Sequence, residues 1–297
     1  MKLNFSNITL KIKGKGNKNV LGYDKNNVYH FGTAYYPKEI RINGKKKDSV
    51  NYSYYFDEEF NTVELIWNNI IASCREMFRR CSDITEFDFS NFDTSEVTDM
   101  TSMFCYCDLL TSLNLTNFDT SKVKDMGFML YYCYSLTSLD LSNFYTSKVT
   151  RMIDMFKGCE NLEFINLKHF SENSLSEYDN MFEYVPENIV ICINENNNKI
   201  LSGIKNKTCY NLAYTDDWKT KQRKIINETG LCIDKCSNDI IYKYEYNGKC
   251  YEKCINGYLI NDNNITTNEC KCQSEKCLTC PQVALNKMLC TKCNDNY

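Results

Sequence analysis

The 297-residue chain has only three prolines, eleven glycines and two histidines, His30 and His169. Scarce glycine leaves no phosphate-cradling loop, and neither histidine comes with an evident nucleophile, so we expect no enzyme, no cofactor and no metal site. The net charge of −3 offers no basic field for nucleic acid or an anionic membrane. No stretch approaches the roughly eighteen apolar residues of a membrane span, and the start lacks the apolar core of a signal peptide. We therefore expect membrane attachment only through segments outside this sequence.

Cysteine is plentiful by contrast, and its distribution divides the chain. Ten of the eighteen cysteines lie between Cys232 and Cys293, whereas the first 231 residues hold eight. Such a shift in composition marks a domain boundary. We expect four regions: a cap (1–70), repeats (71–193), a linker (194–230) and a cysteine-rich module (231–297).

The middle of the chain repeats every 26 residues. The segment NFDTSEVTDMTSMFCYC recurs as NFDTSKVKDMGFMLYYC and then as NFYTSKVTRMIDMFKGC. Within each copy, L-x-x-L-x-L in LTSLNL and LTSLDL predicts a short strand. Val97, Met100, Met103 and Phe104 then recur at helical spacing, which predicts one apolar stripe of a short helix. Together they predict an α/β repeat solenoid of leucine-rich-repeat type, with 26-residue coils. On either side of the repeats we expect a β-rich N-terminal cap and a small disulfide-rich C-terminal module.

One column of the repeat contains cysteines, which could form disulfides between coils or lie buried as small apolar residues. Because free cysteine is among the most buried residue types and Val185 occupies the same column, burial as thiols is favoured. The ladder cysteines are Cys81, Cys107, Cys133 and Cys159.

The tail has few aliphatic residues between its cysteines, so it needs cross-links rather than a hydrophobic core. Two C-x-x-C pairs would suit zinc in a reducing compartment, but ten cysteines divide evenly into disulfides. The cysteines expected to form disulfides are Cys232, Cys236, Cys250, Cys254, Cys270, Cys272, Cys277, Cys280, Cys290 and Cys293. The chain stops directly after a C-x-x-C pair, which suggests a truncated module.

The polar residues of successive strands line up in a candidate ligand face. Repeat proteins bind other proteins through such extended surfaces, although a merely solvated face is the simpler interpretation. The face consists of Glu86, Asp88, Ser112, Asn114, Ser138, Asp140, Phe164 and Asn166. Aspartate columns such as Asp99 and Asp125 could suggest calcium, but Arg151 follows them, which favours a turn role.

The motif SNFDTSEVTDMTSMF with LTSLNL resembles the 26-residue repeat of BspA-like leucine-rich-repeat surface proteins, and CLTC with CTKC is similar to furin-like, growth-factor-receptor-type modules. Where ordinary leucine-rich repeats carry an asparagine ladder, this chain has Phe118 and Phe144, so we expect no such ladder. The resemblance implies a cell-surface or secreted, adhesin-like protein that binds a protein or glycoprotein of a host or matrix. The ectodomain of a signalling receptor and an intracellular scaffold with a zinc-bound tail remain alternatives.

Overall fold

The computed structural model describes residues 6–23, 32–194 and 196–204, Ile240 and Ile241, and the backbone of short strands between residues 211 and 293. The chain divides into two compact units. The first consists of Met1–Asn206 with Leu212–Lys219, and the second of Lys207–Asn211 with Thr220–Tyr297.

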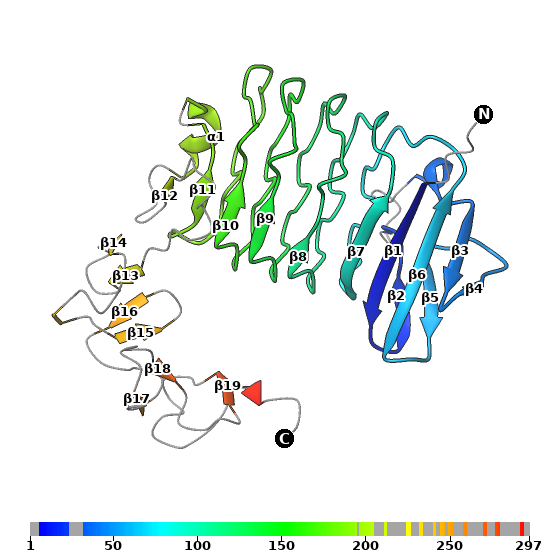
Figure 1. Cartoon of the computed structure of the whole chain (residues 1–297), viewed down its shortest axis with the longest axis horizontal. Helices are drawn as coiled ribbons and strands as arrows, with labels where there is room; N and C mark the ends of the chain where they lie inside the picture. The colour runs from blue at the N-terminus through cyan, green and yellow to red at the C-terminus, as the bar shows by residue number, and fades with distance from the viewer. Residues whose placement is uncertain are drawn as a thin grey trace. The chain divides into compact units, whose positions relative to one another are not determined.

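The first unit begins with an antiparallel sheet in the order β4-β3-β6-β1-β7 (Figure 1). Its strands are β1 (Ser6–Lys13), β3 (Glu39–Ile42), β4 (Lys45–Lys46), β6 (Phe60–Trp67) and β7 (Ile84–Asn91). Alternation explains β1, because Ile8, Leu10 and Ile12 point into the core while the intervening residues do not. A tight turn at Asn43 and Gly44 joins β3 to β4, and both residues have the positive φ that such a turn requires. A second small sheet pairs β2 (Gly16–Asn19) with β5 (Ser53–Phe56), and η1 (Thr33–Tyr35) is a 3-10 turn.

The repeats follow as a ladder of short strands, and from β8 to β11 each strand begins 26 residues after the last. The strand order is β12-β11-β10-β9-β8, and the pairs from β8 to β11 are parallel. The strands are β8 (Ser112–Leu113), β9 (Ser138–Asp140), β10 (Phe164–Asn166), β11 (Val190–Cys192) and β12 (Asn211–Leu212). Figure 1 shows β7 to β11 side by side, so equivalent residues of successive repeats form columns.

The predicted α/β repeat solenoid is wrong, because the structure is β-rich and has almost no helix. Among the described residues the single α-helix is α1 (Asn198–Ser202), and the apolar stripe of 97–104 forms turns. Two residues in each repeat have positive φ, for example Ser102 (56°) and Tyr106 (61°). Two left-handed residues four positions apart interrupt an α-helix, so helical spacing of apolar residues here reflects a series of tight turns.

Backbone hydrogen bonds explain how these turns replace a helix. Between residues 102 and 107, odd-numbered residues close turns within the repeat, as when Cys105 N donates to Ser102 O at 3.2 Å. Even-numbered residues of this segment donate to the next repeat, as when Phe104 N donates to Met129 O at 2.9 Å. Each repeat therefore satisfies its backbone partly through its neighbour, which a helix would not do.

Buried threonines provide a second connection between repeats. Thr94, Thr120 and Thr146 are at most 2 % exposed. Each hydroxyl bonds one residue of the next repeat twice. It accepts a hydrogen bond from the backbone N–H of that residue and donates one to its carbonyl oxygen. For Thr120 the partner is Tyr145, with distances of 2.9 Å to N and 3.3 Å to O. The hydroxyl thus takes the place of a strand pair at a position where the chain turns.

The strands described in the second unit form one four-stranded sheet and two strand pairs. Their strands are β13 (Lys224–Ile226), β14 (Cys232–Ile233), β15 (Tyr244–Tyr246), β16 (Lys249–Tyr251), β17 (Tyr258–Leu259), β18 (Cys270–Lys271), β19 (Cys277–Thr279) and β20 (Lys292–Cys293). The side chains of the ten tail cysteines lie outside the described residues, so their expected pairing stays a prediction. Of the residues described, none belongs to a helix long and apolar enough to cross a membrane.

Candidate functional site

A hollow of about 340 Å³ lies over β7 and β8. These strands end their respective sheets, since β7 is last in the antiparallel sheet and β8 is last in the parallel ladder. The hollow is lined by Glu86, Phe87, Asp88, Phe89, Ser90, Ser112, Asn114, Thr116 and Asn117. Four of the eight residues of the candidate ligand face are therefore brought together in one concave site.

The other half of the candidate ligand face is less accessible. Ser138, Asp140 and Phe164 are half-buried, and Asn166 is only 6 % exposed. Phe164 packs against Val190 and Cys192, which are 1 % and 2 % exposed. The candidate ligand face thus changes from polar and exposed side chains at β7 to apolar and buried ones at β11. Its accessible part is confined to the strands that border the hollow.

One column of the face has a structural role that the sequence did not reveal. Asp88 Oδ1 accepts a hydrogen bond from Ser90 N at 2.9 Å, and Asn114 Oδ1 accepts from Thr116 N at 3.1 Å. Asp140 and Asn166 accept the equivalent bonds in the next two repeats. These Asx turns end each strand, so an aspartate or asparagine is required here whether or not a ligand binds.

The hollow has two carboxylates on β7, and Lys11 of β1 lies opposite Glu86 in the register of the two strands. Glu86 and Asp88 are exposed on β7, and neither forms an ion pair with any residue that the structure describes. The backbone N–H and the side chain of Ser90 both donate to Asp88, which lowers the pKa of its carboxyl. Asp88 is therefore held in its charged form at neutral pH, beside the hydroxyl and amide groups of the opposite wall.

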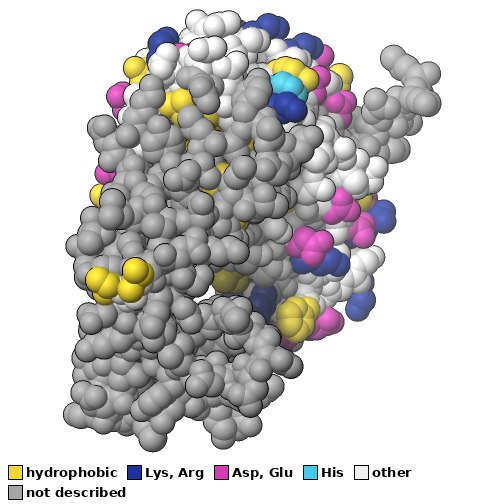
Figure 2. Space-filling view, turned by 60° about the vertical axis from the view of Figure 1, so that its left-hand side comes forward, with side chains coloured by type: hydrophobic (Ala, Val, Ile, Leu, Met, Phe, Trp, Pro, Cys, Tyr) yellow, Lys and Arg dark blue, Asp and Glu magenta, His cyan; other side chains and the backbone are white. Residues whose placement is uncertain are grey.

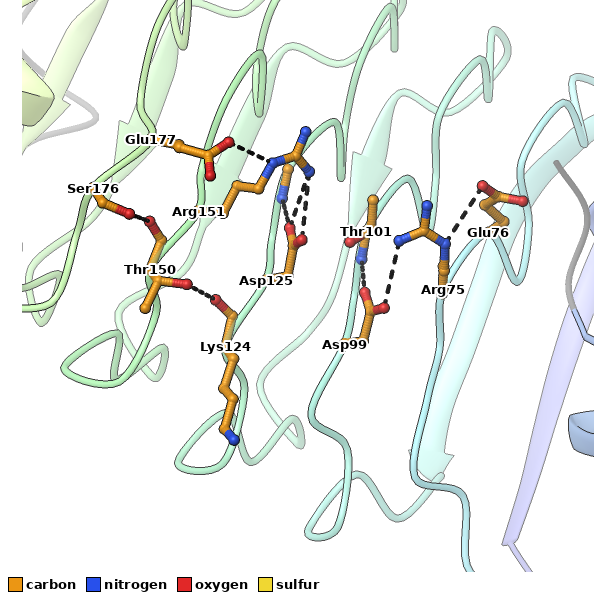
Figure 3. A network of polar contacts seen from close by, with 11 residues as sticks. Arg75, Glu76, Asp99, Thr101, Lys124, Asp125, Thr150, Arg151, Ser176 and Glu177 are labelled. Carbon is orange, nitrogen blue, oxygen red and sulfur yellow. Dashed lines mark hydrogen bonds and ion pairs between the residues drawn. The ribbon is translucent and has the colours of Figure 1, made fainter. Parts of the chain in front are cut away.

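The opposite edge of the repeats carries a ladder of charged side chains instead (Figure 3). Arg151 contacts Asp125 at 3.4 Å and Glu177 at 3.0 Å, and Arg75 contacts Asp99 at 3.6 Å. Asp99 and Asp125 also accept backbone N–H groups two residues ahead. Within the described ranges, no three His, Cys, Asp or Glu side chains form a group that could hold a metal ion. These aspartates serve turns and ion pairs, in keeping with the turn role favoured by the sequence.

The ladder cysteines lie in the core as free thiols. Cys107, Cys133 and Cys159 donate hydrogen bonds to carbonyl oxygens of the preceding repeat, at 3.2 to 3.3 Å. Burial raises the pKa of each of these thiols, that of Cys159 to about 12. A neutral, buried thiol is a poor nucleophile.

An aromatic edge, formed by Tyr106, Phe128, Tyr131, Tyr132 and Tyr134, was missed by reasoning from sequence. The rings of Tyr106 and Tyr132 stack with centroids 5.5 Å apart, and Arg80 lies 5.1 Å from the Tyr106 centroid. Burial raises the pKa of Tyr131 to about 12. The signal available in the sequence was the run of tyrosines after Leu130.

Of the two histidines, His169 lies among the described residues. His169 stacks on Tyr145 at 5.1 Å, and its Nδ1 contacts the carbonyl oxygen of Ser142. His30 lies outside the described residues. Figure 2 shows acidic and basic side chains interspersed over the described part of one face, so charge on that face is mixed.

Comparison with known proteins identifies a similar family for part of the chain. Residues 72–190 match a family described as Mycoplasma protein of unknown function, DUF285. No curated protein and no solved structure matches the chain. The resemblances to BspA-like repeats and to a furin-like module remain predictions, and the finding is that the repeats of this chain are similar to DUF285.

Proposed function

We propose that this chain is a non-enzymatic, cell-surface or secreted interaction protein, adhesin-like in kind, which binds a protein or glycoprotein through the candidate ligand face. The observation that carries the proposal is the hollow, where exposed polar residues of β7 and β8 surround a concave site. Binding sites are typically concave and combine a few polar groups with apolar walls. Glu86, Ser112 and Asn114 are among its polar groups, whereas Phe87 and Phe89 border it on β7 with their side chains buried in the core.

Site-specific photocrosslinking tests the binding surface. A benzophenone amino acid replaces Ser112 at the hollow or, as a matched control, the exposed Lys124 on the charged edge of the repeats. Irradiation of intact cells that produce the protein should give discrete crosslinked products from position 112 and none of them from position 124. Identical products from both positions, or none from position 112, would overturn the proposal.

Thiol counting tests the compartment. Disulfides form and persist in oxidising compartments, so a surface protein should have a fully paired tail. Alkylation of the denatured, unreduced protein should label the free cysteines of the first unit and none of the ten tail cysteines. The free cysteines among the described residues are Cys74, Cys81, Cys105, Cys107, Cys133, Cys159 and Cys192. Labelling of the tail, together with zinc released by a chelator, would refute an extracellular location.

A further inference from the structure

Asn114 combines an acceptor sequence for an N-linked glycan with open space beside its side chain. It begins the triplet Asn-Leu-Thr (114–116), the pattern that accepts such glycans on secreted proteins. The side chain is exposed and borders the hollow of about 340 Å³. A glycan is bulky and hydrated, so a folded chain accommodates it only at an asparagine that it leaves uncovered.

The hydrogen bonds of Asn114 leave its amide nitrogen available. Oδ1 accepts from Thr116 N at 3.1 Å and from Thr116 Oγ1 at 2.8 Å. Because a backbone N–H can only donate, the first of these bonds identifies the oxygen of the amide and so identifies Nδ2 as the other atom. Nδ2 has no hydrogen-bond partner among the residues that the structure describes. A sugar on Nδ2 would therefore break no hydrogen bond of the turn.

The equivalent turns of the other repeats lack this combination. Asp88 and Asp140 are each followed by a serine two positions later, but a carboxylate is not a glycan acceptor. Asn166 is followed by Lys168 and is only 6 % exposed. Of these four turns, the one at Asn114 therefore has both the amide and the hydroxyl that the pattern requires.

Two further triplets of the same pattern lie in the described part of the chain, and neither borders the hollow. Asn7 is half-buried on β1, which pairs with β6 on one side and with β7 on the other. Asn51 is exposed, but its Nδ2 donates to Ser49 Oγ at 2.9 Å. Asn51 therefore offers a matched acceptor sequence away from the candidate ligand face.

We propose that Asn114 carries an N-linked glycan that covers the hollow, so that occupancy of this residue controls access to the candidate ligand face. This inference rests on the proposed function, because it requires a secretory compartment and concerns the same face. Copies of the chain that escape modification keep an open hollow and account for binding by the unaltered protein.

The modification is a transfer from a polyprenyl diphosphate-linked oligosaccharide, catalysed by a separate transferase. Asn114 Nδ2 forms a bond to C1 of the first sugar, and the bond from C1 to the diphosphate oxygen breaks. The polyprenyl diphosphate leaves with the bonding electrons, and Nδ2 gives up one proton. The step involves no oxidation or reduction.

Mass spectrometry of the mature protein, purified from the cells that produce it, tests the modification. A peptide N-glycosidase in heavy-oxygen water converts a glycosylated asparagine to a labelled aspartate, and this label should appear at Asn114. It should be lost in Thr116→Val, which removes the hydroxyl, and kept in Thr116→Ser, which retains it. Asn51→Gln is the control, and it should leave the label at Asn114 unchanged.

The two variants of Thr116 also test access to the hollow. With the benzophenone amino acid at position 112, Thr116→Val should give more crosslinked partner than Thr116→Ser, because no glycan covers the hollow. Thr116→Ser should give the same yield as the protein with Thr116 unchanged.

Unmodified Asn114 in the mature protein would overturn the inference, and so would equal crosslinking yields from Thr116→Val and Thr116→Ser. In either case, crosslinks from position 112 would still support the proposed function. Absence of crosslinks in both variants and in the unaltered protein would instead remove the proposed function itself.

Discussion

Replacement of Thr120 by valine isolates the hydrogen bonds that join one repeat to the next. The side chain is 1 % exposed, and its hydroxyl serves both the N–H and the carbonyl of Tyr145. Valine would leave two partly buried backbone groups without a partner, at about 1 to 1.5 kcal/mol each. Burial of the added methyl group offsets about 0.8 kcal/mol. The free energy of unfolding should therefore fall by about 2 kcal/mol.

Urea denaturation of the full chain, followed by circular dichroism, measures this loss. Thr120→Ser retains the hydroxyl and loses a methyl group, so it should cost only about 1 kcal/mol. Thr98→Val, at an exposed hydroxyl that donates to Ala72 O, should cost less than about 0.5 kcal/mol. If Thr120→Val proves as stable as Thr120→Ser, the hydroxyl does not join the repeats and the reasoning fails.

Three further predictions concern the repeats. A Cβ on Gly158 would lie 2.2 Å from Cδ1 of Tyr132, at a φ of +77°. Gly158→Ala should therefore lower the free energy of unfolding by about 2 to 4 kcal/mol. In a double-mutant cycle measured by urea denaturation, Tyr132→Ala should recover part of this loss. Burial raises the pKa of the Cys133 thiol above its unfolded value, so its contribution to stability is complete below about pH 9 and is lost as the pH rises further; Cys133→Ala should make the urea midpoint less sensitive to pH in that range. Met126 is fully buried, so Met126→Asp should abolish cooperative thermal unfolding, and a melting temperature within a few degrees of wild type would contradict its place in the core.

The columns of the repeat could be predicted from sequence, but the local backbone could not. Leu113 and Leu139 lie buried in paired strands, as their spacing indicates, and Met100 and Met103 lie in the core. The prediction of a helix failed because apolar residues three and four positions apart suit a series of turns as well as a helix. Tyr106 in a left-handed conformation carries no local signal, since bulky residues rarely adopt it and the neighbouring repeat stabilises it.

The expected absence of an asparagine ladder was wrong for a similar reason. Asn117 Nδ2 donates to Ser90 O at 3.2 Å, and Asn143 Nδ2 donates to Leu115 O at 2.9 Å. These asparagines lie one position before Phe118 and Phe144, whereas ordinary leucine-rich repeats have their asparagine at the position of the phenylalanines. Which half of the candidate ligand face is open was equally hidden, because it depends on contacts of Phe164 with residues a full repeat away.

The hydrogen bonds between repeats have a mechanical consequence. Bonds such as Phe104 N to Met129 O run from one repeat to the next, so a pull on the two ends of the ladder loads them along their own direction. Under such a load the repeats should detach one after another rather than shear together. Each step would release 26 residues, which is about 9 nm of extended chain. Under tension the stacked repeats would therefore lengthen in steps and dissipate the load over a long extension.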